Sequence, residues 1–437
     1  MYGLAGRELR FALVISSAHF AQHAFYRVLP PLIPVLAVAL EYPLWQLGLL
    51  ISLYSIGMGL AQAPLGVLSD RIDRVYLLPT GIALTGAAYV LFALAPILGG
   101  PLPELTVVGH AFEGGFLVMT IAMLFVGVGL AVVHPAGYPM ITDNVAPDNK
   151  GKVLGLFGAS SKLGDAAAPA VIAGLIIVLG WEQIILAFGL AGVVFGVLLY
   201  VILYGDTYET VPSAERDEKG DGAVDRREYL YPMIAVYGFF ITSMMAATAL
   251  TSFLPTYLVA VYGFTVELGG LAIQPESVAN LYFAVLLTAG AVTQLFLGGL
   301  ADVYDARTLL IACMGAATVG MVALAVLSVH PLVLVLVVVV LGAGLFGVNP
   351  ARDTLISDLS PPEREGRTFG YVFTAVTLTG APLPTVVGYL LEVLGMRPGY
   401  LLLAIGPVLA IGCVALLYSD RIYRVAPAPE ADVSPGD

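Results

Sequence analysis

The sequence predicts an all-α integral membrane protein with twelve transmembrane helices in two pseudo-symmetric six-helix halves. Of its 437 residues, 59% are hydrophobic and only 11% are charged, whereas soluble domains carry about 25% charged residues because their surface faces water. A helix needs roughly 20 apolar residues to cross the hydrocarbon core of a bilayer. Twelve such segments nearly exhaust the chain, so we expect no folded catalytic domain outside the membrane.

Apolar segments between charged or Gly- and Pro-rich breaks predict where each span lies. The predicted spans are residues 11–40, 44–68, 76–97, 116–140, 152–180, 182–204, 230–260, 277–300, 308–329, 331–357, 367–394 and 398–418. The first contains Pro30, Pro31 and Pro34, which are tolerated where neighbouring helices or a water-lined cavity satisfy the freed carbonyl groups. The predicted domains are bundles at 1–204 and 230–418, a polar cytoplasmic linker at 205–229 and a cytoplasmic tail at 419–437.

Lysine and arginine residues predict the orientation in the membrane. With the N-terminus inside, fifteen of the 19 basic residues fall on the inner side, three lie within spans and only Arg397 lies outside. Cytoplasmic loops are enriched in positive charge, so both termini are predicted in the cytoplasm of a multi-pass plasma-membrane protein. An odd number of spans would disrupt this distribution.

The remaining composition gives three further expectations. The net charge of -12 and the small number of lysines predict a salt-loving host, with ordinary drift in loop composition as the alternative. Cys313 and Cys413 lie in apolar segments and predict neither a disulfide framework nor a zinc site. The N-terminus has no small-residue cleavage site after a short apolar region, so no removable signal peptide is expected.

The two halves repeat at the level of single residues. A shift of 215 residues places Gly127, Gly129, His134, Pro135 and Asp143 on equivalent residues of the second half, which are Gly342, Gly344, Asn349, Pro350 and Asp358. A second alignment, at a shift of 232, matches Gly66, Asp70 and Asp73 with Gly298, Asp302 and Asp305. The different shifts predict a longer loop between the third and fourth spans of the first half. Parallel six-helix repeats place a transporter's site between the halves.

The segment PLGVLSDRIDR at residues 64–74 resembles the signature of the major facilitator superfamily, and GLADVYDAR at 299–307 resembles its weaker second-half copy. This resemblance covers essentially the whole chain and implies the major facilitator fold. It also implies an inner gate whose residues latch the cytoplasmic side. The residues assigned to this gate are Asp70, Arg71, Arg74, Asp143, Asp302, Arg307 and Asp358, with Arg352 and Asp353 interpreted as a further gate or structural pair.

Three other segments resemble transporters of the fosmidomycin-resistance type. They are Ser17 to His19 followed by LPPLIP at 29–34, VHPAG at 133–137 and LFGASSKLG at 156–164. Lys162 departs from that pattern, where a neutral amide is expected, so the resemblance does not imply efflux of that drug.

Three charged side chains are predicted near the middle of the membrane: Arg27 in the first span, and Lys162 and Asp165 in the fifth. Each unpaired charge there costs roughly 2.5–3.5 kcal/mol on insertion scales. Lys162 and Asp165 are three residues apart, so they share a helical face and can pair. The surplus positive charge suits an anionic substrate bound by Arg27 and Lys162, with Tyr26 and His23 beside them. The alternative is an internal triad that only fastens the first span to the fifth.

Histidines follow the same helical face as Arg27. His19 and His23 lie eight and four residues before it, and a neutral imidazole can change charge near physiological pH. His19, His23 and Asp165 are therefore predicted to carry a coupling proton, with hydrogen-bonded packing histidines as the alternative. His134 is interpreted first as a helix-bend and packing residue, and second as a cavity residue.

The leading functional hypothesis is secondary active transport of a small molecule, an organic anion or a drug, by alternating access. Coupling to protons or to another ion is expected, with efflux by antiport as the mode. No Walker-type nucleotide motif is present, which argues against ATP as the energy source. A membrane-embedded metal enzyme is one alternative, based on His19 and His23 at i, i+4, although His110 and His330 are predicted outside and a metal centre needs more ligands at one depth. A nutrient sensor that binds without flux is the other. We expect no enzyme activity, cofactor, bound metal or nucleic-acid partner. The expected partners of a monomeric chain are substrate, protons and the lipid bilayer.

Overall fold

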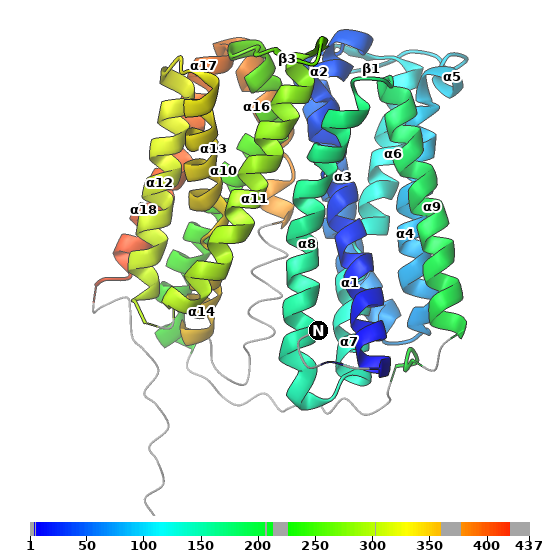
Figure 1. The fold of residues 1–437 in the computed structure, drawn as a ribbon, viewed down its shortest axis with the longest axis vertical. Coiled ribbons are helices and arrows are strands. Elements are labelled where there is room, and N and C mark those ends of the chain that lie inside the picture. Colours follow the sequence, from blue (N-terminus) through cyan, green and yellow to red (C-terminus); the bar gives the residue numbers. More distant parts are fainter. Residues whose placement is uncertain are drawn as a thin grey trace, which may run out of the picture.

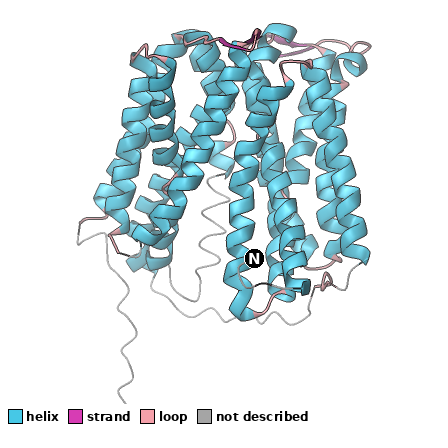
Figure 2. Cartoon of the chain, in the orientation of Figure 1, coloured by secondary structure: helices cyan, strands magenta, loops and turns pink. Residues whose placement is uncertain are grey.

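The computed structural model describes residues 4, 6–205, 208–212, 226–301, 303–359 and 377–419. These residues are almost entirely helical (Figure 2). Eleven of the described helical segments are long and apolar enough to cross a membrane. The remaining predicted span is α8 (Pro147–Leu175), a helix of 29 residues whose hydropathy is lowered by the lysines and aspartates along it. It stands parallel to its neighbours (Figure 1), so the structure fits the twelve predicted spans.

Together with α8, the candidate spans number six in each half of the described residues, and several of them are broken into two helices (Figure 1). The other first-half helices are α1 (Gly6–Tyr26), α2 (Leu29–Leu40), α3 (Leu44–Ser69), α4 (Arg74–Ala93), α5 (Ala95–Gly99), α6 (Gly114–Leu130), α7 (Val133–Asn144) and α9 (Trp181–Gly205). The second-half helices are α10 (Arg226–Val261), α11 (Pro275–Ala301), α12 (Ala306–Val326), α13 (Pro331–Phe346), α14 (Asn349–Leu359), α16 (Leu383–Leu394), α17 (Met396–Leu403) and α18 (Ile405–Leu416).

The breaks within spans follow from the sequence. The first span is interrupted at Arg27, and Pro30 and Pro31 occupy the first turn of α2, where their missing N–H groups cost little. The fourth span breaks between α6 and α7, and the tenth breaks between α13 and α14. His134 and Asn349, which the repeat alignment pairs, each stand at the start of the helix that follows such a break. The repeat therefore extends to local backbone geometry.

Two antiparallel hairpins lie at the end of the molecule opposite the N-terminus, here called the hairpin end (Figure 1). Val108 and Gly109 form the first turn with φ of 49° and 78°, and Gly269 and Gly270 form the second with 58° and 84°. Positive φ at both central residues defines the type I′ turn that matches strand twist. The sequence analysis predicted only a longer loop at the first hairpin. The strands are β1 (Leu105–Val107), β2 (His110–Phe112), β3 (Val266–Leu268) and β4 (Leu271–Ile273).

The two halves are joined near the hairpin end by α3 and α16. Gly48 packs so closely that an added Cβ would lie 2.2 Å from the Pro384 carbonyl oxygen. One turn further on, the hydroxyls of Ser52 and Thr385 lie 2.8 Å apart. At the start of α3, the Leu44 amide donates a hydrogen bond to the Glu392 carboxylate of α16, which suits the positive end of a helix dipole. We call these contacts the α3–α16 seam.

Candidate functional site

A buried ion pair lies at the break in the first span. Arg27 is 9% exposed, and its Nε donates to Oδ1 of Asp165 over 2.9 Å. Its Nη1 donates to the Thr251 hydroxyl of α10 over 3.3 Å. The guanidinium also lies 5.1 Å from the ring centroid of Tyr26. One cation therefore touches an acid of its own half and a hydroxyl of the other half.

Close packing of α1 against α8 positions this pair. A Cβ added at Gly164 would lie only 2.3 Å from the Phe20 carbonyl oxygen, so the two backbones approach as closely as glycine allows. Asp165 is the next residue and is buried against α1. The helix break then turns Arg27 toward this carboxylate. Small size at Gly164 and lost helical regularity at Arg27 together create the pair.

Asp165 is the shared acid of the cluster. Its Oδ2 lies 3.3 Å from His23 Nδ1 and 4.0 Å from Lys162 Nζ, so the predicted Lys162–Asp165 pairing at i, i+3 is present but long. Lys162 and His23 keep 30% and 24% of their side chains exposed, against 9% for Asp165. Lys162 also lies near the second-half pair Arg352 and Asp353. The structure thus brings together the residues predicted to bind substrate.

A histidine group adjoins this cluster. His19 Nδ1 lies 2.7 Å from the Phe157 carbonyl oxygen, and the two rings stack with centroids 3.8 Å apart. The His19 ring lies 4.9 Å from that of His23 and 5.1 Å from that of His134. His134 therefore belongs to the same group as the two α1 histidines. From sequence, His134 was interpreted first as a packing residue, because the i, i+4 spacing of His19 and His23 on one helix cannot show a partner from another span.

At the N-terminal end of the molecule, Arg74 and Asp143 form the first-half contact expected of an inner gate. Arg74 Nη1 donates to Asp143 Oδ2 over 2.8 Å, and Arg74 Nε donates to the Ser69 hydroxyl over 3.2 Å. The Ser69 hydroxyl donates in turn to the Pro135 carbonyl over 2.9 Å. Asp70 is the exposed C-cap residue of α3. These bonds join α3, α4 and α7.

Two aspartates of the signature segments, Asp73 and Asp305, cap helices. Asp73 stands immediately before α4 and accepts a hydrogen bond from the Val75 amide over 2.9 Å. Asp305 stands before α12 and accepts from the Arg307 amide over 2.8 Å. An aspartate at this position satisfies an amide that has no partner within the helix.

The structure describes only some of the predicted second-half gate residues. Arg307 pairs with the Asp305 carboxylate, and its Nη1 donates to the Leu417 carbonyl over 2.9 Å. Asp302 lies outside the described residues, and Asp358 is within α14 with its side chain outside them. The predicted latch roles of Asp302 and Asp358 stay predictions.

Arg352 and Asp353 form a pair on α14. Arg352 Nε donates to Asp353 Oδ1 over 2.8 Å, and Arg352 Nη1 donates to Asn349 Oδ1 over 2.9 Å. The guanidinium lies 4.4 Å from the ring centroid of Phe240 on α10. Asn349 is the repeat equivalent of His134, so the start of this helix carries polar side chains in both halves.

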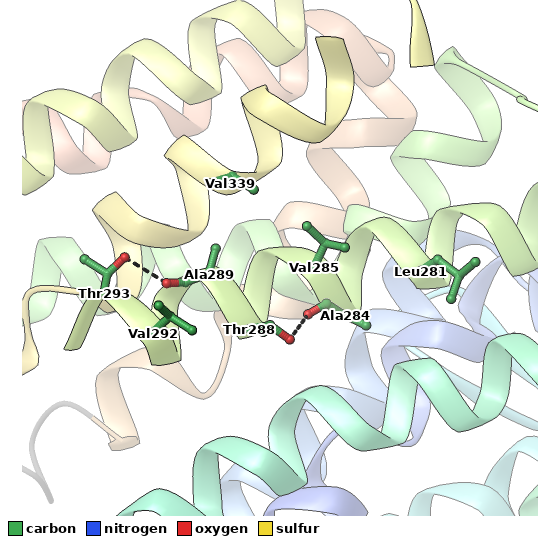
Figure 3. Close-up of a pocket in the computed structure, with 8 residues that line it drawn as sticks. All are labelled: Leu281, Ala284, Val285, Thr288, Ala289, Val292, Thr293 and Val339. Atoms are coloured by element: carbon green, nitrogen blue, oxygen red, sulfur yellow. Dashed lines mark hydrogen bonds between the residues drawn. The ribbon is translucent and has the colours of Figure 1, made fainter. Parts of the chain in front are cut away.

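A separate pocket lies along α11, facing α13 (Figure 3). Its lining is apolar except for Thr288 and Thr293, whose hydroxyls donate to the carbonyls of Ala284 and Ala289 over 2.8 Å. Both hydroxyls are thus occupied within their own helix. No charged residue lines this pocket, so the central charged cluster is the better candidate for binding a polar substrate.

Long membrane-crossing helices in two repeated halves, with charge at the centre, define a polytopic membrane protein of the transporter class. The family model of the Major Facilitator Superfamily matches residues 15–275 and again 271–435. The chain belongs to the Major Facilitator Superfamily. The resemblance to its fosmidomycin-resistance type stays a prediction.

Similar proteins include two named transporters. The chain is 25% identical over 283 residues to the probable L-galactonate transporter of Escherichia coli K12, covering 62% of this chain and 58% of that protein. The chain therefore matches less than two thirds of that relative's length. It is 22% identical over 372 residues to the hexuronate transporter of Bacillus subtilis 168, covering 83% of this chain and 82% of that protein.

Solved structures share the fold. A bacterial homolog of the human lysosomal transporter Spinster, in an inward-facing and unoccupied conformation, matches with a TM-score of 0.77 at 15% identity, covering 98% of this chain and 100% of that one. The inward-open xylose transporter XylE from E. coli matches with a TM-score of 0.73 at 12% identity, covering 97% and 98%. The twelve-helix fold expected from the sequence is confirmed.

Proposed function

We propose that this chain is a secondary active transporter that carries a small organic anion bearing a carboxylate. The observation that carries the proposal is the position of Arg27, which donates to Asp165 in its own half and to Thr251 in the other. A substrate held by this side chain would contact both halves, as alternating access requires. Location in the plasma membrane with both termini in the cytoplasm is part of the proposal.

Charge balance at the site favours an anion. Arg27 and Lys162 contribute two positive charges and Asp165 contributes one negative charge, all at the centre of helices that cross the membrane. A net charge in the membrane interior is costly unless a group of opposite charge neutralises it. The planar guanidinium offers two parallel donors that match a carboxylate, and Lys162 adds a point charge. Tyr26 and His23 lie at the edge of this site.

The relatives' names support the same chemical class. Galactonate and hexuronate are both sugar acids, each with a carboxylate on a polyhydroxylated carbon chain. In this chain a carboxylate would bind at Arg27 and Lys162, while hydroxyls of the substrate would meet side chains such as that of Thr251. We therefore favour a sugar acid or a similar hydroxylated acid over an apolar drug.

Transport is proposed to be driven by protons, since the sequence has no nucleotide-binding motif that would supply energy from ATP. The predicted carriers are Asp165, His19 and His23, and efflux by antiport is the predicted mode. Purified protein in liposomes tests the driving force: an imposed pH gradient should accelerate uptake or release of galactonate, and collapse of the gradient should abolish that acceleration.

Counterflow in proteoliposomes tests the substrate class. Radiolabelled galactonate should exchange with galactonate and glucuronate, whereas xylose and a quaternary amine should compete weakly. Arg27→Gln should weaken galactonate binding about 10- to 100-fold, the loss expected for a charge-assisted hydrogen bond of 1.5–3 kcal/mol. Arg27→Lys should retain part of the affinity. Binding without exchange would instead favour a sensor, and normal counterflow by Arg27→Gln would refute the anion site.

A further inference from the structure

Three histidines from two helices of the first half converge beside the central charges. His19 and His23 come from α1 and His134 comes from α7, which lies next to α1 (Figure 1). One ring nitrogen of each histidine lies within 4.8 Å of the other two. His19 is 4% exposed, and the other two are partly buried.

The His19 ring has the tautomer and the backbone hydrogen bond that are typical of a metal ligand. The carbonyl oxygen of Phe157 can only accept a hydrogen bond, so His19 Nδ1, 2.7 Å away, carries the proton. In the neutral ring the lone pair is therefore on Nε2. Within the described part of the chain, His19 Nε2 is buried and has no hydrogen-bond partner. Donation from the distal ring nitrogen to a backbone carbonyl is the arrangement that orients histidines bound to metals.

His23 shows a related arrangement. Its Nδ1 lies 3.3 Å from the Asp165 carboxylate but lacks the alignment of a hydrogen bond. Donation from Nδ1 to Asp165 would leave the lone pair of the neutral ring on Nε2, where it can bind a metal ion. A carboxylate behind a histidine is the other common support of a metal ligand.

We propose that His19, His23 and His134 bind a late first-row divalent metal ion, with Zn²⁺ as the expected occupant. Imidazole nitrogens suit zinc, copper and nickel, whereas calcium and magnesium prefer oxygen ligands. Three protein ligands also leave a fourth position open to water or an anion. This site adjoins the Arg27 substrate site: His23 lies at the edge of both, and Asp165 contacts both His23 and Arg27.

The three histidine rings must move slightly closer together to bind a metal ion. Zinc–nitrogen bonds of about 2.0–2.1 Å in a tetrahedron place ligand nitrogens about 3.4 Å apart, so the His23 and His134 rings must move toward His19. Arg27 and Lys162 oppose an added cation, while Asp165 favours it. The site is therefore expected to bind the metal more weakly than a structural zinc site with thiolate ligands.

Metal binding to the purified full-length protein tests the proposal, using an affinity tag without histidine. After treatment with a chelator, titration with Co²⁺ should give one ion per chain and the visible absorption of a four- or five-coordinate imidazole site, and Zn²⁺ should displace it. His134→Asn should weaken Co²⁺ binding by about 100-fold or more, since even outer-shell changes cost 10–100-fold. Asparagine is the residue that the second half has at this position, Asn349, so this variant is expected to fold.

A double variant, His110→Asn with His330→Asn, is the matched control. His110 lies in β2 and His330 precedes α13, so both are remote from the proposed site and their replacement should leave Co²⁺ binding unchanged. The proposal is overturned if the wild-type protein shows no stoichiometric Co²⁺ binding, or if His134→Asn binds as tightly as wild type. Because the readout is metal binding, either result leaves the proposal of anion transport untouched.

Discussion

The guanidinium of Arg27 and the hydroxyl of Thr251, 3.3 Å apart, connect the two halves of the transporter at the break in its first span. Thr251 Oγ1 donates its own proton to the Ala247 carbonyl over 2.8 Å, so it faces Arg27 with a lone pair. Any separation of α1 from α10 breaks this bond. The contact therefore couples the charge of the site to the relative position of the halves.

Replacing Thr251 with valine should weaken galactonate binding about 10-fold. Valine keeps the shape of threonine but removes the acceptor, and a hydrogen bond to a charged group contributes about 1.5–3 kcal/mol. Thr251→Ser keeps the hydroxyl and is expected to bind nearly as well as wild type. Calorimetry on the purified proteins would compare the galactonate affinities of the valine and serine variants. Equal affinity in the valine and serine variants would show that the contact is unimportant for the substrate.

Much of the fold was predictable because membrane helices obey simple rules. Backbone groups in lipid must bond within their own segment, so length and apolarity locate the spans. The span containing Lys162 and Asp165 is the least apolar. It was still predicted as the apolar segment 152–180, and the distribution of basic residues elsewhere supports an even number of spans. The repeat paired His134 and Pro135 with Asn349 and Pro350, and the structure has a helix break just before each pair. The salt-loving host inferred from composition stays a prediction.

The site was predictable only within a span. Spacing at i, i+3 placed Lys162 and Asp165 on one face, but contacts between spans depend on helix rotation and tilt, which sequence alone does not provide. Thr251 was one of several hydroxyls in its span, and His134 was separated from His19 by more than 100 residues. The repeat alignment of His134 with Asn349 was the one available sign of a polar role there.

The Arg74–Asp143 contact should behave as one energetic unit. Arg74→Gln and Asp143→Asn are each expected to slow transport and lower the unfolding temperature, because each leaves a largely buried partner unsatisfied. The double variant should be no worse than either single variant, which corresponds to a coupling of roughly 1–3 kcal/mol. Asp70→Asn, at the exposed end of α3, is also expected to slow transport. Additive effects of Arg74→Gln and Asp143→Asn would mean that the two residues act separately.

The helix caps give a stability prediction. Asp73→Ala should destabilise the protein by about 0.5–2 kcal/mol, since the Val75 amide loses its acceptor at the start of α4. Asp73→Ser should recover most of this loss because serine also caps helices well. Thermal unfolding in detergent measures both variants. A Tm for Asp73→Ala that matches wild type would argue against the cap.

The predicted orientation can be checked by cysteine labelling. In a variant without Cys313 and Cys413, a cysteine at Glu104, just before β1, should react with a membrane-impermeant maleimide on intact cells. A cysteine at Ser213, in the predicted cytoplasmic linker, should react only after the cells are opened. The reverse pattern would invert the proposed topology and make the hairpin end cytoplasmic.

Close packing of Gly48 in the α3–α16 seam is expected to hold the hairpin end of the transporter closed. A methyl group at Gly48 would lie 2.2 Å from the Pro384 carbonyl oxygen, a backbone atom that cannot move aside as a side chain does. Gly48→Ala should therefore destabilise the conformation in which the hairpin end is closed, and shift the population toward one in which that end is open. Labelling of a cysteine at Ser52 from the hairpin side should become faster, while net transport slows. Gly174→Ala is the matched control, because a Cβ there meets nothing within 4 Å and should change neither rate. If both alanine variants label at the wild-type rate, close packing at Gly48 does not hold the hairpin end closed.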